Sequence, residues 1–164
     1  MTNNELKVVN VRLVKDESLY SDREIHSKYD AIEIMGNELR KYDREVFCVL
    51  NLKSNGSVIN MNVVSMGTLN SSLVSPREVF KSSILSNAAY MIAIHNHPSG
   101  TVKPSREDFE TTKRLVDCGK ILEIPMIDHL IVASRSNEIY SFAENGVLGK
   151  TMDELNQDFF GRSR

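Results

Sequence analysis

The chain has 164 residues, of which 41% are hydrophobic and 26% are charged, and its formal net charge is −2. These values are typical of one soluble globular domain, and the lack of net positive charge argues against strong electrostatic binding to nucleic acid. No apolar run approaches the roughly 18–20 residues that span a membrane, and residues 1–5 are polar, unlike a signal peptide. We therefore expect a cytoplasmic protein whose two cysteines, Cys48 and Cys118, form no disulfide.

The first part of the chain predicts a strand, a helix and a hairpin. Alternating apolar residues predict a strand over 7–14. The sequence Ser-Asp-Arg-Glu at 21–24 is a capping box, which predicts a helix that starts there and ends near Lys41. Residues 46–52 and 57–66 are β-rich runs on either side of an Asn-Gly turn, which predicts a hairpin. The buried face of the helix is predicted to comprise Ile25, Tyr29, Ile32, Met35 and Leu39.

The middle of the chain predicts a helix followed by a buried strand. The sequence Ser-Pro-Arg-Glu at 75–78 is a second capping box, with proline at the first helical position, and predicts a helix to about Asn87. Residues 88–94 form a continuous apolar run, which is typical of a strand buried on both faces. The inward residues of the helix are predicted to be Val79, Phe80, Ile84 and Leu85.

The last part of the chain predicts one more long helix and two strands. The helix is expected from Ser105 to about Cys118, with Gly119 ending it. Strands are expected at 124–133 and 139–142, and a loose helix beyond Gly149. Because a hairpin is followed by alternating strands and helices, we expect an α/β fold, a three-layer α/β/α sandwich around a mixed sheet. The inward residues of the long helix are predicted to be Phe109, Thr112, Leu115 and Val116.

Two histidines at the end of the predicted central strand are the most informative residues. His95 and His97 are one residue apart, so a strand projects both from the same face, and Pro98 ends strand pairing directly after them. Asp108 follows on the first turn of the next helix. Two imidazoles and one carboxylate are a suitable zinc ligand set, which leaves a fourth position open for a water that can attack a carbonyl. The Ser105 hydroxyl could donate to the resulting oxyanion.

Each of these residues also has an interpretation without chemistry. Ser105 with Asp108 is a helix cap in its own right, and two histidines near a turn are common. The combination of the histidine pair, the proline, the serine and the aspartate is much more specific than any one part, and it favours a metal site. His26 is expected on the exposed side of the first helix. Asp128 and His129 could be a hydrogen-bonded pair in the core, or His129 could support a metal ligand from behind; a role as a direct ligand is disfavoured.

The segment His-Asn-His-Pro-Ser-Gly at 95–100, followed by Ser105 and Asp108, resembles the JAMM (MPN+) metalloprotease motif, H-x-H-P-x(6)-S-x-x-D. The resemblance covers residues 28–148, which we take as a RadC-like JAB/MPN domain, with 1–27 as an N-terminal strand and lead-in and 149–164 as a C-terminal tail. The sequences that are similar to the bacterial RadC branch are Gly67-Thr68-Leu69-Asn70, Pro76-Arg77-Glu78-Val79, Asn87-Ala88-Ala89 and Asp128-His129-Leu130-Ile131-Val132.

The resemblance implies a cytidine-deaminase-like α/β/α fold and one catalytic zinc ion. It implies His95, His97 and Asp108 as the zinc ligands, and Ser105 as the partner of the oxyanion. It also implies a glutamate general base on or just before the first core strand. Glu45 fits that place, and its alternative is a solvated charge at the start of a strand.

The resemblance leads to a main hypothesis and two alternatives. The main hypothesis is a zinc-dependent metallohydrolase of the metallopeptidase or isopeptidase type, acting on a peptide or protein whose identity the sequence does not define. One alternative is a DNA-repair or mobile-element-associated module that binds nucleic acid and has little or no hydrolase activity. RadC proteins usually carry an N-terminal helix-hairpin-helix region, and no such glycine motif occurs here, so this alternative is disfavoured. The other is a metal-free scaffold, which the intact ligand set argues against. No particular oligomeric state is predicted.

Overall fold

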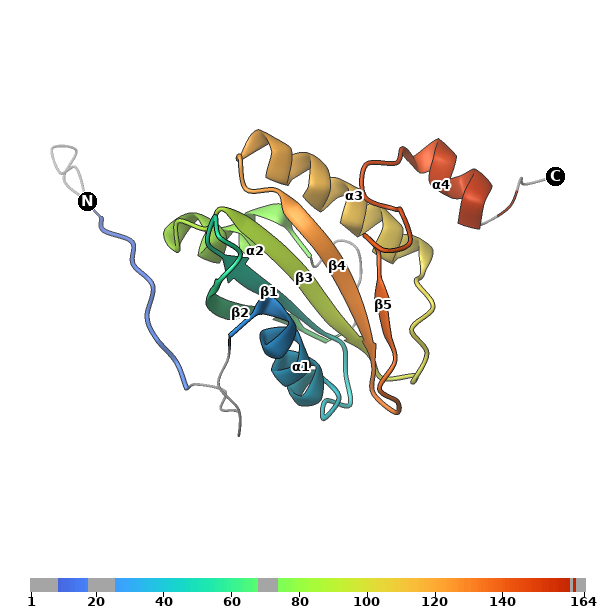
Figure 1. Cartoon of the computed structure of the whole chain (residues 1–164), viewed down its shortest axis with the longest axis horizontal. Helices are drawn as coiled ribbons and strands as arrows, with labels where there is room; N and C mark the ends of the chain where they lie inside the picture. Colours follow the sequence, from blue (N-terminus) through green and yellow to red (C-terminus); the bar gives the residue numbers. More distant parts are fainter. Residues whose placement is uncertain (1–8, 18–25, 68–73, 160, 162–164) are drawn as a thin grey trace, which may run out of the picture.

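A computed structural model describes residues 9–17, 26–67, 74–159 and 161 of the chain. A five-stranded mixed sheet lies at its centre, with helices on both faces (Figure 1). The strand order is β2-β1-β3-β4-β5, with β3 and β4 parallel and the other neighbours antiparallel. The predicted α/β class with a mixed sheet is confirmed. The strands are β1 (Val46–Leu52), β2 (Val58–Met66), β3 (Tyr90–His97), β4 (Met126–Ala133) and β5 (Ile139–Ser141), and the helices are α1 (Lys28–Leu39), α2 (Pro76–Leu85), α3 (Arg106–Ile121) and α4 (Met152–Phe159).

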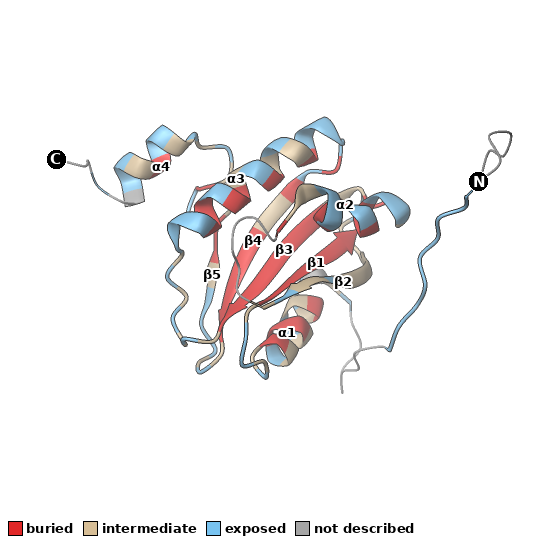
Figure 2. Cartoon of the chain, turned by 180° about the vertical axis from the view of Figure 1, so that it is seen from behind, coloured by how far each residue is buried: buried red, intermediate tan, exposed pale blue. Residues whose placement is uncertain are grey.

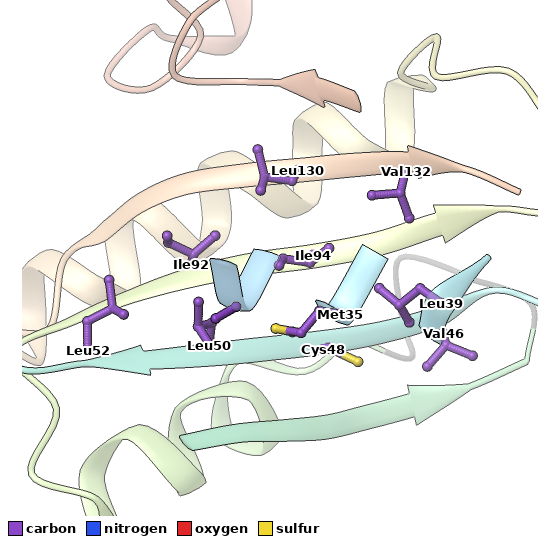
Figure 3. Packing of buried hydrophobic residues seen from close by; sticks show 11 residues of the cluster. Met35, Leu39, Val46, Cys48, Leu50, Leu52, Ile92, Ile94, Leu130 and Val132 are labelled. Carbon is purple, nitrogen blue, oxygen red and sulfur yellow. The ribbon is translucent and has the colours of Figure 1, made fainter. Parts of the chain in front are cut away.

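The side chains of the central strands alternate between two helical layers, as the two-residue period of a strand requires. Cys48 and Leu50 of β1 pack against α1, whereas Phe47 and Val49 pack in the layer of α2 and α3. β1 and β3 are almost entirely buried, and they are red in Figure 2. Every second residue of β1 and β3 therefore faces the α2–α3 layer. Figure 3 shows the opposite layer, in which the labelled residues are Met35, Leu39, Val46, Cys48, Leu50, Leu52, Ile92, Ile94, Leu130 and Val132.

The predicted hairpin is confirmed. β1 and β2 are joined by a tight turn in which the Gly56 amide donates to the Lys53 carbonyl over 2.9 Å. Gly56 adopts a φ of 81°, a conformation that glycine reaches at little cost. The Asn-Gly pair therefore helps to set the register between β1 and β2.

The prediction of a first strand over 7–14 is wrong for the part that the structure describes. Residues 9–14 are extended but pair with no strand, and Val14 is 86% exposed; residues 7 and 8 lie outside the described residues. The alternation of apolar residues matches a strand, but a strand also needs a neighbour for its backbone hydrogen bonds. None is supplied within the described part of the chain.

The first helix starts later than predicted. α1 begins at Lys28, where Ser27 and Asp30 form the capping box: the Asp30 amide donates to Ser27 Oγ over 3.3 Å, and the Ser27 amide donates to Asp30 Oδ2 over 2.8 Å. The predicted box at 21–24 and Ile25 lie outside the described residues. Tyr29 was expected on the buried face but is 71% exposed, because the later start leaves it in the first turn, on the outer side.

The capping box predicted at 75–78 does not form. Ser75 is the N-cap of α2, but its side chain makes no capping hydrogen bond, and the Glu78 carboxylate pairs with Lys81 over 2.6 Å instead. Ile84 and Leu85 were expected to face inward and are exposed. The buried positions of this turn are taken by two serines, Ser82 and Ser83, whose hydroxyl groups are hydrogen-bonded to the buried Asn51 of β1.

Gly119 was predicted to end the third long helix, but it lies buried within α3. A Cβ at this position would lie 2.7 Å from the carbonyl oxygen of Ile124 and 3.4 Å from the ring of Phe80. Glycine is therefore needed for a close approach between α3 and the segment leading to β4, and the helix continues to Ile121. The remaining predicted strands and the C-terminal helix lie within a few residues of their expected positions.

Two further expectations concern the cysteines and the membrane. Cys48 and Cys118 are free thiols, as predicted, and burial raises the pKa of Cys48 to about 12. None of the helices in the described residues has the length and apolar character needed to cross a membrane.

Candidate metal centre

β3 and α3 bring the three predicted ligand residues together. His95 and His97 are the sixth and last residues of β3, and both face the α2–α3 layer because Met91 and Ala93 do so earlier in the strand. Asp108 lies in the first turn of α3. The exposed fractions of the three residues are 0%, 8% and 7%, so the group is almost closed to solvent.

Both imidazole Nε2 atoms and the two carboxylate oxygens of Asp108 converge within this group. The Nε2 atoms of His95 and His97 lie 3.0 Å apart. His95 Nε2 lies 3.2 Å from Asp108 Oδ1, and His97 Nε2 lies 3.5 Å from Asp108 Oδ2. Among the residues that the structure describes, this is the one group of three or more His, Cys, Asp or Glu side chains whose ligand atoms come together, and it could hold a metal ion.

The charges at this group favour an ionised Asp108. Burial alone would raise the pKa of its carboxyl, but the neighbouring imidazoles of His95 and His97 outweigh burial and hold the pKa well below its usual range. For His97, burial acts to lower the pKa, whereas the hydrogen bond and charge of Asp108 raise it, with a smaller contribution from Glu45, and the net result is a raised pKa. The carboxylate is therefore available as a ligand without having to lose a proton.

Ser105 is the N-cap of α3, as expected from the interpretation of Ser105 and Asp108 as a helix cap. The Asp108 amide donates to Ser105 Oγ over 3.1 Å, while the Ser105 amide and hydroxyl donate to Asp108 Oδ2 over 2.7 and 2.8 Å. The cap thus also orients the carboxylate toward the histidines. The structure brings Ser105 to the edge of the group, at an exposed position.

We expect Ser105→Ala to lower the free energy of unfolding by about 1 kcal/mol, because it removes the side-chain acceptor of the α3 cap. Urea denaturation of the metal-free protein measures this loss. Ser27→Ala is the matched control, since Ser27 forms the same capping box on α1, away from the histidines. The two variants should lose similar stability; a Ser105→Ala variant as stable as the parent protein would contradict the cap.

Glu45 lies just before β1, opposite the end of β3. Phe47 pairs with His95 in an antiparallel register. Continuing this register by two residues, backward from Phe47 and forward from His95, places Glu45 opposite His97. Glu45 directly precedes β1, whose Phe47 stacks its ring on His95 with centroids 6.0 Å apart. Its effect on the pKa of His97 agrees with this placement.

Asn96 is a residue whose role sequence reasoning missed. It lies between the two histidines, points to the other face and is fully buried. Its Oδ1 accepts from the Val46 amide over 2.7 Å and its Nδ2 donates to the Arg44 carbonyl over 3.0 Å. The two bonds hold the backbone on both sides of Glu45. The sequence signal that could have indicated this role is a polar residue at a position of a buried strand where an apolar residue is expected.

His129 lies behind His95. His129 Nε2 is 2.9 Å from His95 Nδ1, and its ring is fully buried and stacked on Phe142 with centroids 4.8 Å apart. The side chain of Asp128 accepts from the Ser141 hydroxyl over 2.7 Å, from the Ala143 amide over 3.0 Å and from the His129 backbone amide over 2.7 Å. Both interpretations of His129 are therefore met in part: its ring contacts a candidate ligand, and Asp128 is hydrogen-bonded to its backbone but not to its ring. His26 is exposed, as expected, but it lies before α1 rather than on it.

Comparison with known proteins agrees with the motif. A model of the RadC-like JAB domain family matches residues 25–147. A UPF0758 protein of Syntrophomonas wolfei is 51% identical over 100 residues, which cover 61% of this chain and 43% of that protein. UPF0758 proteins of Bacillus cereus strain AH187 and Bacillus anthracis strain CDC 684 are each 43% identical over 136 residues, which cover 82% of this chain and 59% of theirs. The chain thus spans roughly half the length of these curated relatives. It belongs to the RadC-like JAB domain family.

Proposed function

We propose that the protein is a zinc-dependent metallohydrolase of the metallopeptidase or isopeptidase type, which cleaves an amide bond in a peptide or protein. The observation that carries the proposal is the buried group of donor atoms from His95, His97 and Asp108. Three protein ligands leave a fourth position of a tetrahedral site open, which is the pattern of catalytic rather than structural zinc.

The separations in the donor group support zinc. Tetrahedral bonds of about 2.0–2.1 Å to nitrogen and oxygen place neighbouring ligand atoms about 3.3 Å apart. The two Nε2 atoms lie 3.0 Å apart, His95 Nε2 lies 3.2 Å from Asp108 Oδ1, and His97 Nε2 lies 3.5 Å from Asp108 Oδ2. In addition, His97 Nδ1 lies 3.0 Å from the Thr101 carbonyl, which can only accept a hydrogen bond, so the proton of the neutral ring belongs on Nδ1. The Nε2 lone pair of His97 is then available to a metal.

The other residues have roles that follow from their positions. Zinc, when bound, lowers the pKa of a coordinated water to about 7 and polarises a carbonyl group. Glu45, opposite His97, would accept the proton of the attacking water and return it to the leaving nitrogen, as a general base and then a general acid. The Ser105 hydroxyl, at the edge of the group, would turn from Asp108 to donate to the oxyanion.

Hydrolysis of two probes tests the proposal. The protein is treated with a chelator, reloaded with one equivalent of zinc, and incubated with a quenched fluorescent peptide library of random sequence and with a lysine-isopeptide counterpart. We expect cleavage of at least one probe, which stops when zinc is removed and returns when it is restored. A His95→Ala variant purified in parallel controls for contaminating proteases. Zinc-loaded protein that cleaves neither probe above the level of this variant would refute the proposal.

A further inference from the structure

We infer that Thr112 and His129 are positioning residues, which hold the imidazole of His95 in the one tautomer that leaves its Nε2 atom free for a metal ion. The inference rests on the proposed metal binding and goes beyond it by assigning a role to two residues outside the ligand set. Its basis is a chain of hydrogen bonds whose direction can be determined.

The chain of hydrogen bonds crosses three elements. It begins at His95 Nδ1 on β3, which is 2.9 Å from His129 Nε2 on β4. It continues from His129 Nδ1 to the hydroxyl of Thr112 on α3, over 2.6 Å. It ends where Thr112 Oγ1 donates to the backbone carbonyl of Asp108, over 2.7 Å. His95, His129 and Thr112 are at most 1% exposed, so water cannot replace any of these contacts.

The carbonyl of Asp108 sets the direction of the whole chain. A carbonyl oxygen only accepts, so the single hydroxyl proton of Thr112 is directed to Asp108. The Thr112 oxygen must then accept from His129, which places the ring proton of His129 on Nδ1. A neutral imidazole carries one such proton, so His129 Nε2 is an acceptor.

The same reasoning fixes the tautomer of His95. Since His129 Nε2 accepts, the proton in the 2.9 Å contact belongs to His95 Nδ1. The other nitrogen of His95, Nε2, is left with a lone pair that points at the donor group. If the hydrogen bonds ran in the opposite direction, Thr112 would donate to His129 Nδ1 and His129 Nε2 would donate to His95 Nδ1. The proton of the neutral His95 ring would then lie on Nε2, where a metal must bind.

A positive charge would stabilise the resulting arrangement. When its ring is neutral, His97 has its proton on Nδ1, toward Thr101, so the lone pairs of His95 and His97 face each other over 3.0 Å beside the Asp108 carboxylate. Two lone pairs and a negative charge at this separation repel one another unless a metal ion or a proton lies between them. Asp108 thus acts twice: its carboxylate is a donor in the group, and its backbone carbonyl sets the tautomer of His95.

Nitrogen-15 NMR of the histidine side chains tests the direction of the chain without any activity measurement. Long-range proton–nitrogen spectra distinguish the two neutral tautomers of each ring. In the metal-free wild-type protein at neutral pH, we expect His129 to be in the Nδ1–H form. An Nε2–H form of His129 would overturn the inference, because the hydrogen bonds would then run the other way.

The affinity for zinc, measured by competition with a chromophoric chelator, tests the consequence. Thr112→Val keeps the shape of the side chain but removes the hydroxyl, and we expect it to weaken zinc binding by about 10–100-fold. Thr112→Ser restores the hydroxyl and should bind within about threefold of wild type. Thr111→Val is the matched control, since Thr111 is a buried threonine on the same helix that is not part of the chain. Zinc binding by Thr112→Val at wild-type affinity would overturn the inference.

The two measurements separate this inference from the proposed function. A wild-type protein that binds no zinc but shows the Nδ1–H form of His129 would contradict the metallohydrolase alone. A wild-type protein that binds zinc with His129 in the Nε2–H form would contradict the positioning role alone. If Thr112→Val does not fold, the spectrum of the wild-type protein still decides the direction of the chain.

Discussion

Replacing His97 with alanine is expected to weaken zinc binding by about 10²–10³-fold. Apparent binding free energies of about 10–16 kcal/mol for four-ligand zinc sites correspond to roughly 2.5–4 kcal/mol per ligand, and each 1.4 kcal/mol is a factor of ten. The loss is at the upper end if Asp108, which His97 contacts over 3.5 Å, also turns away. Competition with a chromophoric chelator measures the affinity.

His26→Ala is the control for this experiment. It removes a histidine from an exposed position outside the donor group, so the zinc affinity of the variant should equal that of the parent protein. Equal affinities in the His97→Ala variant and the parent protein would show that zinc binds elsewhere, and the proposed site would have to be abandoned.

Glu45→Gln is expected to slow hydrolysis by about 10²–10⁴-fold, because an amide cannot accept the proton that a general base removes. Zinc affinity should stay within about threefold of wild type, since Glu45 is not one of the three converging donors. The rate is measured with the peptide or isopeptide probe that the wild-type protein cleaves. A slower hydrolysis rate with unchanged zinc affinity would show that Glu45 acts as a general base and not as a zinc ligand.

Glu107→Gln provides the matched control for Glu45. It makes the same change of charge at an exposed position of the first turn of α3, next to Asp108. We expect it to hydrolyse the probe at the wild-type rate. If Glu45→Gln does the same, the proton is accepted by another group, and Glu45 is the solvated charge of the alternative interpretation.

The donor group could be predicted from the sequence because local geometry determines most of it. A strand places His95 and His97 on one face whatever its neighbours are, and a cap on the next helix fixes where Asp108 points. The hairpin could be predicted for a similar reason, since the conformation of Gly56 depends on its own turn.

The surroundings of the donor group could be predicted only in part, because they depend on how separate elements pair. The sequence left open whether His129 supports a metal ligand, and its ring reaches His95 because β4 pairs in parallel with β3 in a register that puts His129 beside Ala93. The Asn96 side chain is hydrogen-bonded to the Val46 amide on another strand, and the Thr112 hydroxyl to the Asp108 carbonyl one helical turn earlier. The spacing of residue types in the sequence does not show either contact.

The errors at the helices have a related cause. The structure forms a capping box at Ser27, whereas the box predicted at 21–24 lies outside the described residues. Glycine is a common residue at the end of a helix, but Gly119 is needed for the close approach of Ile124. At Gly119, tertiary packing rather than local preference determines the role of the residue.

The position of the metal ion tests the central claim most directly. Crystals of the zinc-loaded protein, measured on both sides of the zinc absorption edge, locate the ion by anomalous scattering. We predict one zinc ion per chain, about 2.0–2.2 Å from His95 Nε2, His97 Nε2 and a carboxylate oxygen of Asp108. An anomalous map with no peak among these three side chains, or with its peak bound elsewhere, would contradict the account.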